Sequence, residues 1–263
     1  MSWLEAIILG ILQGLTEFLP VSSSGHLELG KILMGVEAEK SLMFTVVVHG
    51  ATVLSTLVVF RREIWMLLKG LFLFRWNDET RYLSYIALSM LPVGFVALLM
   101  KEQAEMLFNG NLVLVGSMLL VTATLLMLTR WVKPGEKPIK GFDALIIGVA
   151  QAIAILPGLS RSGATIATGL YLGNKREEVT RFSFLMVLIP VIGENILSLL
   201  KGDMGGPGSD ISPFALLLGF AAAFTAGLFA CRWMIRIVNR GNLVWFALYC
   251  CIVGLIALAF GIF

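Results

Sequence analysis

Two polar stretches inside apolar segments contain the residues best suited to chemistry. The first runs from Gln13 to His26 and reads Q-G-L-T-E-F-L-P-V-S-S-S-G-H. The second runs from Gln151 to Thr165 and reads Q-A-I-A-I-L-P-G-L-S-R-S-G-A-T. Aligned without gaps, it is a degenerate copy of the first, with Arg161 in the place of Ser23. We expect the two stretches to form one site for a phosphate-bearing lipid.

The first stretch contains groups that can move protons. Gln13 and Glu17 are four residues apart and therefore share a helix face, and ionisable groups at membrane depth usually face a cavity or a partner. Glu17 could activate a hydroxyl or a water, or hold a divalent cation. His26 follows Ser22 by four residues, so its imidazole should lie near the hydroxyls as a base, an acid or a phosphate ligand. Ser23 is a candidate nucleophile, but its sequence context is equally typical of a phosphate-binding hydroxyl.

Both stretches can start a new helix after a proline. The first N–H groups of a helix and its dipole form an anion site, and a guanidinium such as that of Arg161 matches phosphate oxygens. Two opposed hairpins would bring both helix starts to one point, where a phosphate or Glu17 neutralises Arg161. The candidate phosphate-binding residues are Ser22, Ser24, Gly25, Ser160, Ser162 and Gly163.

The composition is that of a helical integral membrane protein. The 263 residues are 58% hydrophobic with a mean hydropathy of +0.89, and 14% are charged, where soluble domains have about a quarter. The net charge of +3 is small, and we expect no nucleic-acid partner. Six apolar runs are long enough to cross a bilayer: Leu42–Phe60, Tyr82–Met100, Leu112–Arg130, Val179–Leu200, Phe214–Met234 and Leu243–Ile262.

Two further apolar segments, Trp3–Met34 and Phe142–Leu172, are interrupted in the middle. Each half has about a dozen residues, too few to span at 1.5 Å per residue, so each segment is predicted to be a re-entrant helix-turn-helix hairpin. The fold class is then all-α, with six transmembrane helices plus two re-entrant hairpins. One hairpin and three spans in each half predict an inverted-topology repeat within a single domain, 1–263, with repeats of about 1–135 and 136–263.

The distribution of basic residues predicts the orientation. Loops rich in Lys and Arg alternate with loops poor in them, and the rich loops should be cytoplasmic. The first hairpin then enters from outside and the second from inside. Arg61–Trp76 is basic and aromatic and should lie on the inner surface, whereas the Gly- and Pro-rich segment 202–212 should lie outside. No cleavable signal peptide is expected, because no basic segment precedes Leu4.

Other polar residues in the apolar segments favour structural roles. His49 is expected to bond to a neighbouring helix, and Asp143 to act as a first-turn acid on a helix dipole. Glu194 stays open between the cavity wall and a structural partner. The cysteines are expected to be small core residues, without a disulfide or metal: Cys231, Cys250 and Cys251.

The two stretches resemble the signatures of the undecaprenyl-diphosphate phosphatase family, also called the bacitracin-resistance protein family. The resemblance covers the whole chain and implies a bacterial inner-membrane enzyme. This enzyme removes the terminal phosphate of undecaprenyl diphosphate to recycle the carrier for cell-wall synthesis. It implies a divalent cation, Mg²⁺ or Ca²⁺, a cavity open to the outer, periplasmic side, and Arg161 as the phosphate-binding arginine. Position 13 is Glu in some members and Gln in others. The Gln13 present here means that a two-carboxylate metal site cannot be assumed, and more of the acidic role falls on Glu17.

Two other functions compete with a phosphatase. Inverted repeats and broken helices are typical of transporters, so a flippase for a polyprenyl phosphate lipid is the main alternative. A structural scaffold fits less well, since it does not explain a buried set of Arg, Glu and His. The expected partners are a polyprenyl diphosphate substrate and membrane lipids, and a homodimer stays open.

Overall fold

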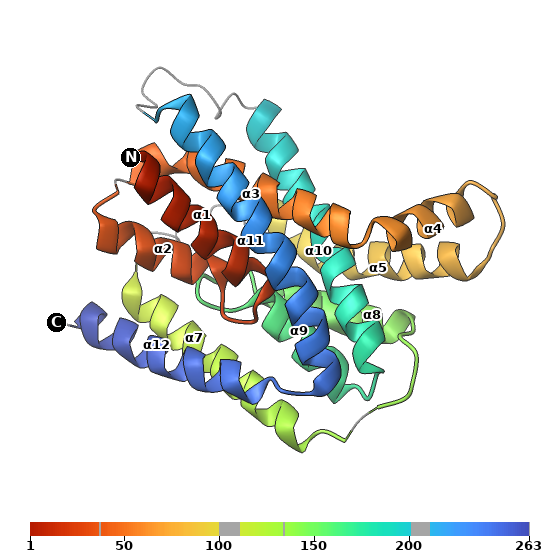
Figure 1. Cartoon of the computed structure of the whole chain (residues 1–263). Coiled ribbons are helices and arrows are strands. Elements are labelled where there is room, and N and C mark those ends of the chain that lie inside the picture. Colours follow the sequence, from red (N-terminus) through yellow and green to blue (C-terminus); the bar gives the residue numbers. More distant parts are fainter. Residues whose placement is uncertain (37, 100–110, 134, 201–210, 263) are drawn as a thin grey trace.

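A computed structural model describes residues 1–36, 38–99, 111–133, 135–200 and 211–262, without the side chains of residues 38–42, 194, 198, 199 and 262. Most of the predicted outer segment 202–212, and the side chain of Glu194, lie outside the described part. The helices in Figure 1 are α1 Trp3–Phe18, α2 Ser23–Met34, α3 Ala38–Val59, α4 Arg61–Leu71, α5 Asp78–Leu99, α7 Leu112–Leu128, α8 Gly141–Ile153, α9 Arg161–Tyr171, α10 Arg176–Leu200, α11 Pro213–Arg240 and α12 Val244–Ile262.

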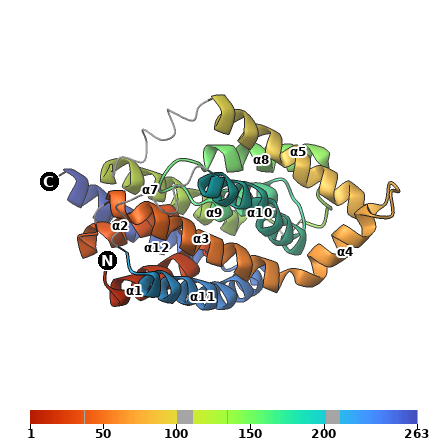
Figure 2. The same cartoon turned by 90° about the horizontal axis from the view of Figure 1, so that it is seen from above.

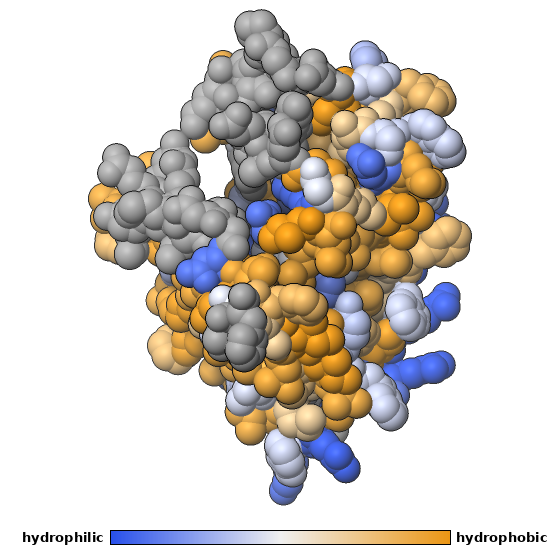
Figure 3. Space-filling view, turned by 90° about the vertical axis from the view of Figure 1, so that its left-hand side faces the viewer, coloured by the Kyte–Doolittle hydropathy of each residue, from blue (hydrophilic) through white to orange (hydrophobic). Residues whose placement is uncertain are grey.

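The chain is a multi-pass membrane protein. Within the described residues, five helices are long and apolar enough to cross a bilayer: α5, α7 with the short 3-10 turn after it, α10, α11 and α12. A sixth crossing is obtained if α3 and α4 count together, although they meet at a bend of 75°. Each of the six predicted apolar runs therefore corresponds to one helix. The surface in Figure 3 is mostly apolar, with hydrophilic side chains gathered along its right and lower edges.

The two interrupted segments each form two short helices, as predicted. α1 and α2 have 16 and 12 residues, and α8 and α9 have 13 and 11. α1 ends two residues before Pro20, and α8 ends four residues before Pro157; a proline removes one hydrogen bond from a helix and can break it there. Within each pair the two helices pack against each other. The pairs are therefore helix-turn-helix hairpins, and both turns lie inside the bundle.

Close backbone contacts hold each hairpin in place. A Cβ atom added to Gly14 of α1 would lie 2.4 Å from the carbonyl oxygen of Ala223 in α11, and one added to Gly10 would lie 2.4 Å from that of Gly219. A Cβ atom added to Gly148 of α8 would likewise lie 2.3 Å from the carbonyl oxygen of Ser89 in α5. α9 and α10 lie at the centre, between α3 and α8 (Figure 2). Glycine at these positions therefore lets the hairpins approach their supporting helices closely.

A polar cluster fastens the start of the second hairpin. Asp143 accepts hydrogen bonds from Lys137 Nζ at 2.8 Å, from the Lys140 N–H at 3.0 Å and from Asn174 Nδ2 at 3.2 Å. Burial raises the pKa of this carboxyl, but the hydrogen bonds from Lys137, Lys140 and Asn174 outweigh burial and lower it below the ordinary value. Asp143 is therefore a first-turn acid, as predicted, and it also joins the loop before α8 to the loop after α9.

The contact between α1 and α11 predicts opposite effects of the same substitution at two glycines. Gly14→Ala should lower the free energy of unfolding by about 1–3 kcal/mol, because the new methyl group overpacks a backbone contact. Gly94→Ala in α5 is the matched control, since an added Cβ there meets nothing within 4 Å and a helix gains from alanine. Denaturant titration in detergent micelles measures the free energy of unfolding of both variants. Equal values would contradict a close backbone contact at Gly14.

Candidate active site

The turns of the two hairpins touch. The Cβ of Pro20 lies 3.3 Å from the position that a Cβ on Gly163 would take, and the Cα of Gly158 lies 3.4 Å from the equivalent position on Gly25. The Ser162 hydroxyl reaches the Leu19 carbonyl at 3.4 Å. Gly158 has a φ of 93°, which only glycine adopts without strain. Small residues at the turns thus let segments far apart in sequence share one place.

Each turn ends in a serine that caps the next helix. The Ser22 hydroxyl accepts from the Gly25 N–H at 3.4 Å, and the Ser160 hydroxyl accepts from the Gly163 N–H at 3.0 Å. Both predicted phosphate-binding glycines therefore already use their N–H groups in caps. Ser22 has a φ of 69°, a conformation that costs about 1–3 kcal/mol in a residue with a side chain and often marks a functional site.

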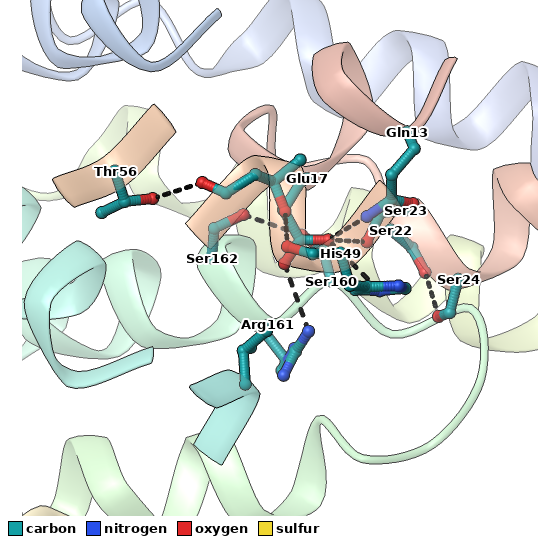
Figure 4. A network of polar contacts seen from close by, with 12 residues as sticks. Gln13, Glu17, Ser22, Ser23, Ser24, His49, Thr56, Ser160, Arg161 and Ser162 are labelled. Atoms are coloured by element: carbon teal, nitrogen blue, oxygen red, sulfur yellow. Dashed lines mark hydrogen bonds and ion pairs between the residues drawn. The ribbon is translucent and has the colours of Figure 1, made fainter. Parts of the chain in front are cut away.

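Each capping serine also pairs with the serine two residues later. Ser22 and Ser24 hydroxyls lie 3.4 Å apart, and Ser160 and Ser162 hydroxyls lie 3.3 Å apart. All four side chains line the same cavity (Figure 4). The hydroxyls stand at the starts of α2 and α9, whose first N–H groups have no partner inside the helix. The cavity therefore has hydrogen-bond donors from both hairpins.

Glu17 is the centre of the polar network in Figure 4. Its Oε2 accepts from the Ser23 hydroxyl at 2.6 Å and from Gln13 Nε2 at 2.9 Å, and its Oε1 pairs with Arg161 Nη2 at 3.2 Å. Ser23 and Arg161 are the first residues of α2 and α9, so equivalent positions of the two hairpins contact the two oxygens of one carboxylate. The structure thus brings together Glu17, Ser23 and Arg161, as the aligned stretches predicted.

His26 was expected in the same cavity, but it lies apart from these three residues. It is buried and does not line the cavity. Its Nδ1 lies 2.9 Å from the Ser22 carbonyl oxygen, so Nδ1 carries the proton and Nε2 accepts from the Tyr249 hydroxyl at 2.8 Å. The two rings are stacked, with centroids 5.4 Å apart. This geometry supports the strained cap of α2 and joins it to α12; the role of His26 in proton transfer stays a prediction.

His49 is a site residue that the sequence reasoning missed. It was expected to bond to a neighbouring helix, but its Nδ1 lies 2.8 Å from the Thr45 carbonyl of its own helix α3. Its Nε2 lies 3.8 Å from Glu17 Oε2, and His49 is not among the residues that line the cavity. The missed signal was its isolation: it is the only titratable residue in the apolar run Leu42–Phe60.

Thr122 of α7 was also not anticipated. Its fully buried hydroxyl accepts from the Ser160 N–H at 3.0 Å and donates to the Met118 carbonyl at 3.0 Å. It thereby fixes the second turn to α7, and no motif in the sequence distinguished it from other threonines of that helix.

The cavity has a polar and an apolar side. Its polar side comes from α1 and the starts of α2 and α9. Its apolar side comes mainly from α10, through Phe184, Val187, Leu188 and Val191. A ligand that fits both sides carries a strongly polar group next to a hydrocarbon.

Comparisons with known proteins show the family of this chain. Residues 6–256 match the family model described as bacitracin resistance protein BacA. The chain belongs to this family. Proteins named undecaprenyl-diphosphatase from Bacteroides thetaiotaomicron and Parabacteroides distasonis are 54% and 53% identical to it over 97% and 98% of both chains, and one from Salinibacter ruber is 39% identical over 97% of both.

The residues of this family member do not fit a cation held by the protein alone. Within the described part of the chain, no group of three or more His, Cys, Asp and Glu side chains could hold a metal. Both oxygens of Glu17 already accept from donors, and the neighbouring Gln13 Oε1 accepts no hydrogen bond from the described residues. One carboxylate and one amide oxygen are too few for a Ca²⁺ cage made by the protein, and a Mg²⁺ with so few protein ligands is usually completed by waters and substrate phosphates.

The pair of Glu17 and Arg161 should couple more strongly than an exposed pair of the same length. The Arg81–Asp78 pair is also 3.2 Å long, but its side chains are 47% and 91% exposed, against 28% and 10% for Arg161 and Glu17. A double-mutant cycle of Glu17→Gln and Arg161→Met should give a coupling free energy of about 1–3 kcal/mol. The cycle of Asp78→Asn and Arg81→Met should give less than about 1 kcal/mol. Denaturant titration measures both cycles, and equal couplings would contradict the burial argument.

Proposed function

We propose that this protein is an undecaprenyl-diphosphatase, which hydrolyses undecaprenyl diphosphate to undecaprenyl phosphate and inorganic phosphate. The observation that carries the proposal is the Ser23 hydroxyl, which donates to Glu17 at 2.6 Å in the cavity that Arg161 also lines. A candidate nucleophile, a base and a phosphate-binding guanidinium lie next to an apolar wall, and this combination suits a lipid diphosphate. Relatives that carry this name are 52–54% identical over nearly the whole chain.

In the proposed reaction the terminal phosphate binds Arg161 and the first N–H groups of α2 and α9. Ser23 Oγ attacks the terminal phosphorus while its proton moves to Glu17, and the Oγ–P bond forms. The P–O bond to the inner phosphate breaks, and the electron pair leaves with undecaprenyl phosphate, which takes the proton from Glu17. Water then hydrolyses the phosphoserine, with Glu17 as the base, and restores the Ser23 hydroxyl. Arg161 stabilises the charge on the transferred group in both steps.

The other candidate site residues bind the phosphates or position the groups that react. Ser22, Ser24, Ser160 and Ser162 supply hydroxyls to the phosphates, and Gly25 and Gly163 let the two turns meet. Gln13 donates a hydrogen bond to Glu17 from the same helix. His26 bonds to the carbonyl of Ser22, the residue that caps α2 just before Ser23. A divalent cation, in this proposal, arrives with the diphosphate, whose oxygens supply the ligands that the protein lacks.

The chain is proposed to be an inverted-topology repeat with two re-entrant hairpins. Support comes from helix boundaries and from packing. α1 packs on α11 as α8 packs on α5, and α3 packs on α10. The first three helices of the two halves begin at Trp3, Ser23 and Ala38, and at Gly141, Arg161 and Arg176, each 138 residues later.

Placing the basic loops in the cytoplasm puts the entry of the first hairpin outside. The cavity would then open to the outer, periplasmic side, where the diphosphate of the carrier is released.

A polyprenyl phosphate flippase is the second candidate, because repeats and broken helices also occur in transporters. Cysteine substitution at Ser23 and Ser162, with labelling from each side of the membrane, separates the two. Labelling from one side supports an enzyme alone, and labelling from both sides supports a flippase.

Loss of the Ser23 hydroxyl or of the Arg161 guanidinium should stop catalysis without unfolding the protein. Ser23→Ala and Arg161→Ala should each lower kcat for phosphate release from a prenyl diphosphate at least about 100-fold, because each removes a group that acts on the transferred phosphoryl. Ser117→Ala is the control, since this exposed hydroxyl of α7 bonds to the Val113 carbonyl. Full activity of Ser23→Ala would exclude Ser23 as nucleophile, and full activity of Arg161→Ala would exclude Arg161 as phosphate ligand.

The absence of a complete protein ligand set predicts how cations act. Chelation should lower phosphate release, and Mg²⁺ or Ca²⁺ should restore it. Without substrate, millimolar Mg²⁺ should raise the Tm no more than a monovalent salt of equal ionic strength, because a cation stabilises a protein only through a site in its folded state. Saturable stabilisation of the substrate-free protein would show a resident cation site.

A further inference from the structure

Ser183 of α10 has a buried hydroxyl for which the described residues offer no hydrogen-bond partner. The residue is 3% exposed, and it lines the same cavity as Glu17 and Arg161. A buried hydroxyl left unpaired costs about 1–3 kcal/mol. An unpaired group that faces a cavity therefore indicates a ligand that completes it.

Other hydroxyls in the helices around this cavity donate hydrogen bonds to carbonyls of their own helices. Thr52 and Thr56 of α3 also line it, and they donate to carbonyls three and four residues earlier, at 2.8 and 3.0 Å. Thr180, one turn before Ser183 on α10, donates to the carbonyl four residues earlier at 2.7 Å. A serine in a helix has the same option. The Ser183 hydroxyl instead remains available to the cavity.

Gln151 of α8 is a second residue of the cavity lining with a polar atom that has no partner among the described residues. Its Oε1 is buried and accepts no hydrogen bond, and its Nε2 contacts only the Met90 sulfur at 3.9 Å. Sulfur is a weak acceptor, and rotation of the amide exchanges oxygen and nitrogen at little cost. Gln151 can therefore present a donor to an anion in the cavity.

The cavity face of α10 changes from polar to apolar along the helix. Ser183, Val187 and Val191 follow at intervals of four residues and share one face, with Phe184 and Leu188 beside them. The face offers one hydroxyl and then two turns of hydrocarbon. This arrangement suits the junction between a phosphate and an isoprenoid chain.

We propose that Ser183, together with Gln151 of the same cavity lining, binds the phosphate that stays on the lipid, while Ser23 and Arg161 act on the terminal phosphate. The assignment rests on the proposed function, and it follows from the position of Ser183 next to the apolar strip. This phosphate is the leaving group, whose negative charge grows as the P–O bond breaks. A hydrogen bond from Ser183 therefore strengthens in the transition state.

Three variants of α10 test this subsite with a prenyl diphosphate in detergent. Ser183→Ala removes the hydroxyl and should lower kcat/KM about tenfold or more, since hydrogen bonds to charged groups contribute about 1.5–3 kcal/mol. Ser183→Thr keeps the hydroxyl and should restore kcat/KM to within about threefold of the wild type. Thr180→Ala is the matched control, because that hydroxyl bonds to its own helix, and it should leave kcat/KM unchanged. If Ser183→Ala behaves like Thr180→Ala, the subsite does not exist.

Two inhibitors distinguish which phosphate Ser183 binds. Ser183→Ala should weaken inhibition by a prenyl monophosphate about tenfold and leave inhibition by inorganic phosphate within about twofold, because free phosphate occupies the Arg161 end. The assignment to the lipid-borne phosphate would be overturned if Ser183→Ala weakened only the inhibition by inorganic phosphate. It would also be overturned if the variant weakened inhibition by the two compounds equally.

Thermal unfolding separates this proposal from the proposed reaction. Without ligand, Ser183→Ala should unfold at or above the Tm of the wild type, because it removes an unpaired buried group. A prenyl monophosphate should raise the Tm of the wild type more than that of Ser183→Ala. If the wild type released no phosphate from a prenyl diphosphate, the proposed reaction would fail, while this difference in Tm would still decide the role of Ser183. Equal shifts in the two proteins would overturn it.

Discussion

One carboxylate joins the two halves of the molecule. Glu17 accepts from the first residue of α2 and pairs with the first residue of α9, at 2.6 and 3.2 Å. A buried carboxylate is costly unless it is paired and hydrogen-bonded, and here every donor comes from a different turn or helix. The packing of α1 on α11 and the contact between the turns are what keep these donors in reach. The catalytic geometry therefore depends on the whole bundle, although it uses few residues.

The serine caps connect local chain geometry to this centre. A proline ends the helix before each turn, and a serine starts the next one. The caps consume the N–H groups of Gly25 and Gly163, so the N–H groups left for an anion are those of the first two residues of each helix. Ser23 and Arg161 are first residues, and their backbone and side chain consequently face the same cavity.

The sequence predicted the helices, both breaks and the meeting of Glu17, Ser23 and Arg161, because these follow from apolar run length, proline and the gapless alignment of two stretches. It did not predict His49 beside Glu17, Tyr249 beside His26 or the unpaired Ser183. These depend on how helices distant in sequence rotate against one another. A lone polar residue in an apolar run carries no information about the face it will occupy until the neighbouring helices are placed.

The two halves differ at the position where they meet, and this difference has an evolutionary consequence. The same residue at this aligned position in both stretches would place either two hydroxyls or two guanidiniums against Glu17. Two hydroxyls would leave the phosphate without a cation, and two guanidiniums would leave it without a nucleophile. Divergence at aligned positions divides these tasks between the two stretches: Ser23 aligns with Arg161, and Glu17 aligns with Ile155. The aligned stretches keep a common framework of capping serines, and substitutions at several aligned positions make them complementary.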